Sequence, residues 1–156
     1  MNDQGSRSGA IAGILSVLIS LLLAADDSVG KTWRVEKDGT GDFTVIQAAA
    51  DAAADGDTIR IGPGEYEEMT DYQVDCCLVN PVVVGIHRND ITILGSHRDS
   101  VLVGPRVRHR DGFGIVMRYG ASTNLRLQDL TIRGLREGVR VTGYAALTGV
   151  RLTGQP

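Results

Sequence analysis

Short runs in which apolar and polar residues alternate recur along this chain, and Gly, Pro and Asp separate them. Such runs cover residues 32–35, 90–95 and 101–103, and a further run ends at Ile61. Strict alternation predicts strands with one buried face and one polar face. The chain therefore reads as a series of short strands joined by many turns, which predicts an all-β fold.

Two further stretches are less regular. Leu78 to Gly85 is apolar but carries Pro81, which has no backbone N–H and predicts the edge or the start of a strand. Residues 65–75 are acidic and poor in apolar periodicity, so they predict a loop.

Only one stretch predicts a helix. Thr44 is a good N-cap residue, Gln47 completes a capping box, and Phe43 occupies the staple position before it. Gly56 stands where a left-handed C-cap residue belongs. The spacing predicts a helix of roughly three turns that covers the open end of a stack of strands. Its narrow apolar face would consist of Val45, Ile46, Ala49, Ala50, Ala52 and Ala53.

Internal repeats indicate how the strands stack. The apolar residues and glycine of 127–134 recur in 147–154 at an offset of 20, and those of 114–117 recur in 138–141 at an offset of 24. A third alignment places 91–95 against 130–134 at an offset of 39. Such periods predict the coils of a parallel β-helix. A leucine-rich-repeat solenoid would require a Leu-x-x-Leu-x-Leu-x-x-Asn frame, which is missing.

Two segments resemble a known family. Asp38 to Ala49, Asp-Gly-Thr-Gly-Asp-Phe-Thr-Val-Ile-Gln-Ala-Ala, is followed by Asp55 to Tyr66, Asp-Gly-Asp-Thr-Ile-Arg-Ile-Gly-Pro-Gly-Glu-Tyr. Together they resemble the N-terminal entry of the pectin-lyase-like superfamily, which includes pectinesterases. The resemblance implies a right-handed parallel β-helix (solenoid) with a short N-terminal capping α-helix, over residues 32–156. Because the sequence stops straight after a strand, we expect it to be truncated, with a last coil open to self-association.

The same resemblance implies a chemistry. Pectinesterase-like enzymes use two Asp carboxylates, an Arg and Gln donors on one exposed sheet. Leu130-Thr-Ile-Arg-Gly134 resembles the strand that leads into that site, and Glu137-Gly-Val-Arg-Val141 stands where the family has Gln-Ala-Val. An ionised Glu137 cannot donate a hydrogen bond. The nucleophile is expected beyond Pro156, so the catalytic and substrate-binding residues stay unknown, and we expect neither a metal nor a cofactor.

The first residues predict export. Ile11 to Ala25 is an apolar run that is shorter than a membrane span and resembles the h-region of a signal peptide over residues 1–25. An uncleaved N-terminal anchor or a buried helix is the alternative. Export predicts a secreted, periplasmic or cell-surface protein.

Charge is distributed unevenly. Residues 26–97 hold fourteen acidic and five basic residues, whereas residues 98–156 hold ten Arg, no Lys and four acidic residues. Arg binds carboxylates bidentately, so the second half is suited to an acidic polysaccharide. The alternative is that Arg only keeps outward strand positions solvated. The overall charge of −3 and the 4% of aromatic residues argue against nucleic acid.

Other polar residues have structural interpretations that are simpler than functional ones. Adjacent Cys76 and Cys77 fit a strand with one side chain in and one out; a strained vicinal disulfide or intermolecular pairing is the alternative. Asp129 and Glu137 are predicted to form solvated ion pairs with Arg133 and Arg140, a sugar-contact surface being the alternative. Four aspartates suit turns and caps better than calcium, and three histidines are spaced too irregularly for a metal: Asp38, Asp42, Asp55 and Asp57; His87, His97 and His109.

Two short motifs are rejected because each lacks the rest of its pattern. Gly39-Thr-Gly41 lacks the third glycine of a dinucleotide loop, and His109-Arg110-Asp111 lacks the rest of a kinase catalytic loop.

The sequence thus predicts the N-terminal part of an exported, carbohydrate-active β-helix protein, similar to pectinesterases and pectin lyases, that acts on or binds an acidic polysaccharide. The alternative is a non-catalytic surface or periplasmic β-helix with a binding or structural role.

Overall fold

The computed structural model describes residues 30–75, 77–117 and 124–154. The predicted export segment Ile11 to Ala25 lies outside the described residues, so the prediction of a signal peptide remains a prediction. Within the described part, no helix is both long and apolar enough to span a lipid bilayer.

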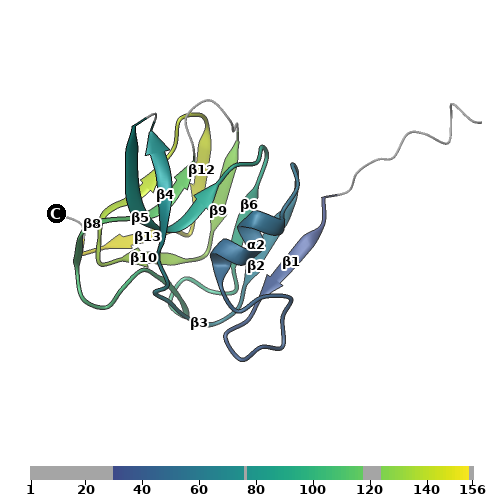
Figure 1. Cartoon of the computed structure of the whole chain (residues 1–156). Coiled ribbons are helices and arrows are strands. Elements are labelled where there is room, and N and C mark those ends of the chain that lie inside the picture. Colours follow the sequence, from purple (N-terminus) through teal and green to yellow (C-terminus); the bar gives the residue numbers. More distant parts are fainter. Residues whose placement is uncertain (1–29, 76, 118–123, 155–156) are drawn as a thin grey trace, which may run out of the picture.

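The described residues form an all-β fold with one short helix, as the alternating pattern predicts (Figure 1). In chain order the elements are β1 (Thr32–Val35), α2 (Ile46–Ala52), β2 (Thr58–Ile61), β3 (Gly64–Tyr66), β4 (Thr70–Asp75), β5 (Leu78–Ile86), β6 (Thr92–Gly95), β7 (Val101–Val103), β8 (His109–Met117), β9 (Leu125–Gln128), β10 (Thr131–Arg133), β11 (Leu135–Arg140), β12 (Ala145–Thr148) and β13 (Arg151–Thr153).

These strands form three sheets, which we call A, B and C. Sheet A has the order β1-β2-β6-β9-β12, sheet B the order β13-β10-β7-β3, and sheet C the order β11-β8-β5-β4. All pairs are parallel except the hairpin β4–β5. From β2 onward the chain visits A, B and C in turn, so each strand lies beside the strand of the previous visit to the same sheet.

Two of the three predicted repeat alignments are confirmed by the strand register. Leu127 pairs with Leu147, and Ile115 pairs with Val139. The third alignment is wrong, because Ile93 pairs with Leu127 and not with Ile132. The motif apolar-Thr-Ile-x-Gly occurs at the end of β6 in sheet A and of β10 in sheet B. The two copies therefore lie in different sheets and do not pair with each other.

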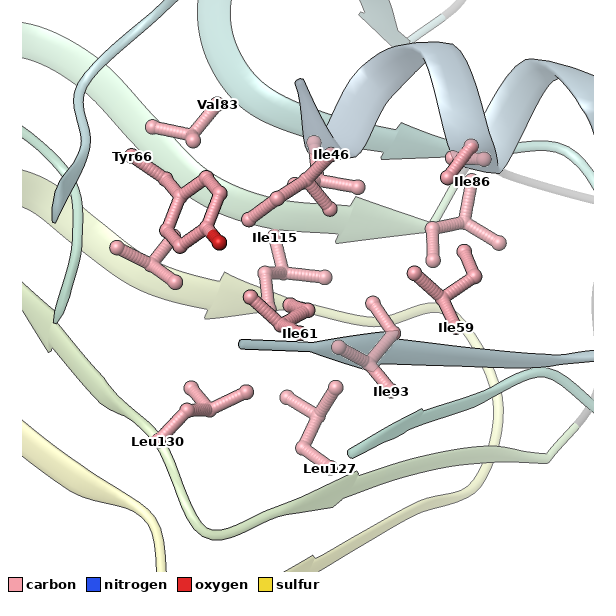
Figure 2. Packing of buried hydrophobic residues seen from close by; sticks show 14 of the residues in the cluster. Ile46, Ile59, Ile61, Tyr66, Val83, Ile86, Ile93, Ile115, Leu127 and Leu130 are labelled. Carbon is pink, nitrogen blue, oxygen red and sulfur yellow. The ribbon is translucent and has the colours of Figure 1, made fainter. Parts of the chain in front are cut away.

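The core lies between the three sheets and is built from ladders of inward residues. Ile59, Ile93 and Leu127 occupy successive strands of sheet A, and each is 0% exposed (Figure 2). Tyr66 is also 0% exposed, and its hydroxyl donates to the carbonyl oxygens of Val35 at 3.3 Å and Gly62 at 3.1 Å. Burial raises the pKa of Tyr66 to about 12, so its phenol stays a neutral donor inside the stack.

The last strands of two sheets are less covered. Leu147 on β12 and Leu152 on β13 are each 49% exposed, whereas Leu127 and Ile132 beneath them are 0% exposed. The inward-facing leucines of these two edge strands are therefore less buried than their partners on β9 and β10, which have a strand on both sides.

The helix covers the other end of the stack, but its predicted caps are wrong. Helix α2 packs against β5, β1 and β2, and its Ala49 and Ala50 are buried, which confirms that part of the predicted alanine face; Ala52 is exposed, so its predicted place on the face is wrong. It has seven residues, about two turns. Its N-cap is Val45, with no side-chain cap.

Gln47 does not form a capping box, because it binds the neighbouring sheet. Its Oε1 accepts from the backbone N–H of Gly85 at 2.7 Å, and its Nε2 donates to the carbonyl oxygen of Gly85 at 3.2 Å. Gly56 has the expected left-handed conformation (φ 86°), but the helix C-cap is Ala53. Gly56 therefore belongs to the turn before β2.

The predicted loop at 65–75 is also wrong, because β3 and β4 occupy most of it. Tyr72 and Val74 alternate with polar residues and are buried, a signal that the many acidic residues obscured. Pro81 lies inside β5, where the strand pairs only with β4; pairing with β8 begins at Val82. The predicted edge position is thus confirmed for that half of the strand.

The central ladder gives a stability prediction. We expect Ile93→Ala to lower the free energy of unfolding by about 2–5 kcal/mol, because it leaves a cavity between Ile59 and Leu127. Leu94→Ala, on the outward face of the same strand, is the control and should cost much less. Urea denaturation followed by circular dichroism measures both, and equal losses would contradict the assignment of faces.

A second stability prediction concerns Asp57, which is 5% exposed. Burial raises its pKa, but hydrogen bonds from the N–H of Ala54, the Trp33 indole and the N–H of Lys31 outweigh burial and hold the pKa below its usual range. Its contribution is therefore present above the unfolded-state pKa and is lost as pH falls through the folded-state pKa. We expect Asp57→Asn to destabilise by about 1–3 kcal/mol at neutral pH and to flatten the acid side of a stability profile. An unchanged acid slope would argue against this role.

Candidate functional site

The arginines of the second half are the candidate ligand-binding residues, and the fold pairs several of them with acids from the first half. On sheet B, Arg106 Nε lies 2.5 Å from Glu65 Oε2. Arg133 Nη2 lies 3.0 Å from the same oxygen and 3.4 Å from Glu67 Oε1. The strong charge separation along the sequence is thus partly cancelled in space.

We call Glu65, Glu67, Arg106 and Arg133 the sheet B network. Its acidic and basic side chains pair with one another. The hydrogen bond from Arg106 lowers the pKa of Glu65 more than burial raises it, and Arg133 lowers it further. The carboxylate therefore stays ionised at neutral pH and keeps both guanidinium groups engaged. These two arginines are less available to an external carboxylate than the sequence alone suggests.

A second group lies on sheet C, on β8 and β11, and we call it the sheet C cluster: Phe113, Arg136, Glu137 and Arg140. The guanidinium carbon of Arg140 lies 4.7 Å from the centroid of the Phe113 ring, and that of Arg136 lies 5.9 Å from it. Phe113 is 1% exposed, so its ring orients the two cations and is not a surface on which a sugar can stack.

Glu137 is committed to Arg140. The Arg140 Nε donates to both Glu137 oxygens at 3.1 Å, and Nη2 donates to Oε2 at 2.7 Å. The predicted Glu137–Arg140 ion pair is confirmed. The prediction of an ion pair is wrong for Asp129, which forms none with a described residue, and Arg133 instead binds Glu65 on β3 and Glu67 just after it.

Not every arginine is neutralised in this way. Within residues 30–75, 77–117 and 124–154, five exposed arginines from the second half form no ion pair: Arg98, Arg108, Arg110, Arg126 and Arg136. Arg136 combines this state with a fixed position beside Phe113. It is therefore the best-placed arginine of sheet C for an external anion.

The four aspartates have the predicted structural roles. Asp38 accepts from the backbone N–H and hydroxyl of Thr40, Asp42 from the N–H of Arg34, and Asp55 from the backbone and side chain of Asn89. Asp57 joins Lys31, the residue directly before β1, to Ala54 in the turn after α2. No group of three or more potential metal ligands occurs among the described residues.

The histidines and the cysteine pair are surface residues where they are described. His87, His97 and His109 are all exposed, as predicted. Cys77 is a free, exposed thiol in the turn between β4 and β5, so the prediction of a strand position is wrong for it. Cys76 lies outside the described residues.

Comparison with known proteins adds no identity: a scan against protein-family models and a search of curated proteins both find no match.

Sequence reasoning missed one arrangement. Arg34 and Arg60 come from the acidic first half, yet strand register places them side by side, on the same outward sheet face as Arg126. The polar positions of the alternating pattern in residues 32–35, 58–61 and 125–128 were a usable signal for this arrangement. Counting charges by halves of the chain hid it.

The sheet B network gives a prediction about how stability depends on pH. We expect Glu65→Gln to cause a small loss of stability at neutral pH, because two arginines lose a charged partner. The pKa of Glu65 is lowered, so the difference from the unsubstituted chain should disappear as pH falls through that pKa. Thermal unfolding at several pH values measures this. Glu137→Gln, which lies outside this network, is the comparison variant. A difference in stability between Glu65→Gln and the unsubstituted chain that stays constant at all pH values would contradict the prediction.

Proposed function

We propose that this chain is the N-terminal part of an exported, carbohydrate-active parallel β-helix protein of the pectin-lyase-like kind, and that it binds an acidic polysaccharide through the sheet C cluster. The observation that carries the proposal is the combination of Arg136 and Arg140 held on one buried aromatic ring. Guanidinium groups fixed in this way lose little conformational freedom when they bind a carboxylate.

The fold part of the proposal is a right-handed β-helix. It is supported by the repeated visits to sheets A, B and C in the same order and by the parallel register of their strands. The Asp38 to Tyr66 segments that resemble the pectin-lyase-like entry form β1, α2, β2 and β3 and the connections between them. The segment that resembles the strand leading into the pectinesterase site includes β10, and Glu137, near where that family has a Gln, lies on β11, which links the resemblance to the cluster on sheet C.

The ligand part rests on charge and geometry. Arg136 has no ion-pair partner among the described residues, and Arg140 is one-third exposed on its side chain (34%) while it binds Glu137. A linear polysaccharide that carries carboxylates offers repeated acceptors for such donors. Glu137 sets a limit on affinity, because its charge repels the same ligand.

Binding is better supported than catalysis by the described residues. The one carboxylate in the cluster is paired with Arg140, so it is poorly suited to act as a nucleophile or general base. This observation favours the alternative of a non-catalytic binding module. Turnover of a pectin-like ester or glycosidic bond is proposed only for the whole protein.

The test is binding of the full chain to polygalacturonate, a linear carboxylated glycan, measured by isothermal titration calorimetry. We expect Arg136→Ala with Arg140→Ala to weaken binding by about tenfold or more. Glu137→Gln should strengthen binding, because it removes a negative charge without removing volume.

Arg98→Ala is the matched control, since it removes an exposed arginine that lies in the turn after β6. It should leave the affinity nearly unchanged. Equal effects of Arg98→Ala and of the cluster variants would indicate binding through overall charge, and no binding by the unsubstituted chain would overturn the proposal.

A further inference from the structure

The outward face of sheet A carries a second set of cations that the sheet C cluster does not involve. Strand register aligns its outward residues in two rows that cross all five strands. One row is Thr32, Thr58, Thr92, Arg126 and Ala146; the other is Arg34, Arg60, Leu94, Gln128 and Thr148. The inward residues between them are core residues such as Ile59, Ile93 and Leu127, so alternation fixes the direction in which these side chains point.

The charge on this face is of one sign. Its ten outward positions hold three arginines and no acidic residue. Arg60 and Arg126 are exposed and form no ion pair with any described residue. Arg34 forms an ion pair with Glu36, with Nη2 at 3.5 Å from Oε1, and the side chain of Arg34 is 56% exposed. Unlike Arg106 and Arg133 of sheet B, the cations of sheet A are thus mostly available to an external anion.

A hollow lies at the end of this face where β9 and β12 begin. Its volume is about 130 Å³, and its walls are Asn124, Leu125, Arg126, Tyr144, Ala145 and Ala146. Tyr144 is 82% exposed, although large aromatic side chains are normally covered. Asn124 is held by a hydrogen bond from its Nδ2 to Asp90 Oδ1 at 2.8 Å, which fixes one side of the hollow.

The hollow is small compared with a site for a whole small molecule, which spans about 300–1,000 Å³. It therefore suits one unit of a longer ligand that continues over the sheet. An exposed aromatic ring beside a guanidinium group fits a sugar ring that carries an anionic substituent, because the ring contacts apolar C–H groups while the cation binds the charge.

We propose that the outer face of sheet A binds a linear anionic glycan that crosses the strands, with one sugar unit held between Tyr144 and Arg126 and its charged groups on Arg126, Arg60 and Arg34. Neighbouring strands are about 4.8 Å apart, so Arg60 on β2 and Arg126 on β9, two strands away, are separated by about 10 Å across the sheet and by two residues along the strand direction. That spacing corresponds to about two units of an extended sugar chain. The threonines and Gln128 offer hydroxyl and amide groups to the units between the arginines.

This surface is separate from the sheet C cluster, so the inference goes beyond the proposed function and does not depend on it. Single-stranded nucleic acid is the competing polyanion, but such ligands are bound by several aromatic residues in series. The outward rows contain no aromatic residue, and among the residues that the structure describes only Tyr144 lies at their end. A glycan is therefore the better match.

The experiment measures binding of the full chain to dextran sulfate by biolayer interferometry, with uncharged dextran as the ligand control. We expect Arg60→Ala with Arg126→Ala to weaken binding by about tenfold. Tyr144→Ala should weaken it by about three- to tenfold without a change in net charge. If this face also binds carboxylates, the same two variants should also weaken binding to polygalacturonate.

Arg108→Ala with Arg110→Ala is the matched control, because it removes the same charge from exposed residues at and just before the start of β8 in sheet C. An equal loss in this control would show binding through bulk charge and would overturn the inference. So would normal binding by the Arg60 and Arg126 variant, or stronger binding of a single-stranded oligonucleotide than of dextran sulfate. Loss of binding only on substitution of Arg136 and Arg140 would overturn this inference and leave the proposed function intact.

Circular dichroism and thermal unfolding confirm that each variant is folded. The substituted side chains are exposed and face away from the core, so we expect no large change in stability.

Discussion

Parallel stacking of strands in register is the constraint on which the other features of this chain depend. Each circuit places an apolar side chain on the equivalent side chain of the preceding circuit, and Ile59, Ile93 and Leu127 form such a ladder with no exposed surface. The hydrogen bonds between strands fix the spacing at about 4.8 Å. A ladder residue is therefore buried by its neighbours above and below, and the partial exposure of Leu147 and Leu152 follows directly from the lack of a described strand beyond β12 and β13.

The first circuit meets the same requirement in a different way. Helix α2 places Ile46, Ala49 and Ala50 on the ladder and is fastened by two side chains that make backbone contacts over long sequence distances. Gln47 binds both backbone groups of Gly85, and Asp57 accepts three hydrogen bonds from Lys31, Trp33 and Ala54. Three hydrogen-bond donors compensate for the desolvation of this buried carboxylate. Removing any donor would leave part of the desolvation penalty uncompensated and lower the stability of the fold. The short helix thus depends on tertiary contacts and not on its own caps.

Much of the fold was predictable because alternation reports burial directly. Residues 32–35 and 101–103 are strands with the predicted bounds, and the strand predicted before the turn at Gly62 ends at Ile61 as expected. The errors have a common origin in interactions between distant residues. Thr44 and Gln47 match a capping box locally, but Gly85 competes for Gln47. Residues 65–75 have a high charge that obscured the alternation of Tyr72 and Val74. Of the candidate site, sequence identified the Glu137–Arg140 pair, which is local, but not the partners of Arg106 and Arg133, because Glu65 and Glu67 come from an earlier circuit.

The contrast between the three outer faces is a consequence of the same stacking. Inward positions are restricted to apolar residues, whereas outward positions are free to carry any charge, and register brings together residues that are separated by one circuit of the chain. On sheet B this brings acids next to arginines, and the charges cancel. On sheet A it aligns Arg34 with Arg60 and adds Arg126 two strands further on, with no acid in either row. Since the backbone and the inward ladder hold the strands together, these cations contribute little to folding. These arginines are therefore free to bind a ligand. For that reason, an outward row of like charges is stronger evidence for binding than the total charge of either half of the chain.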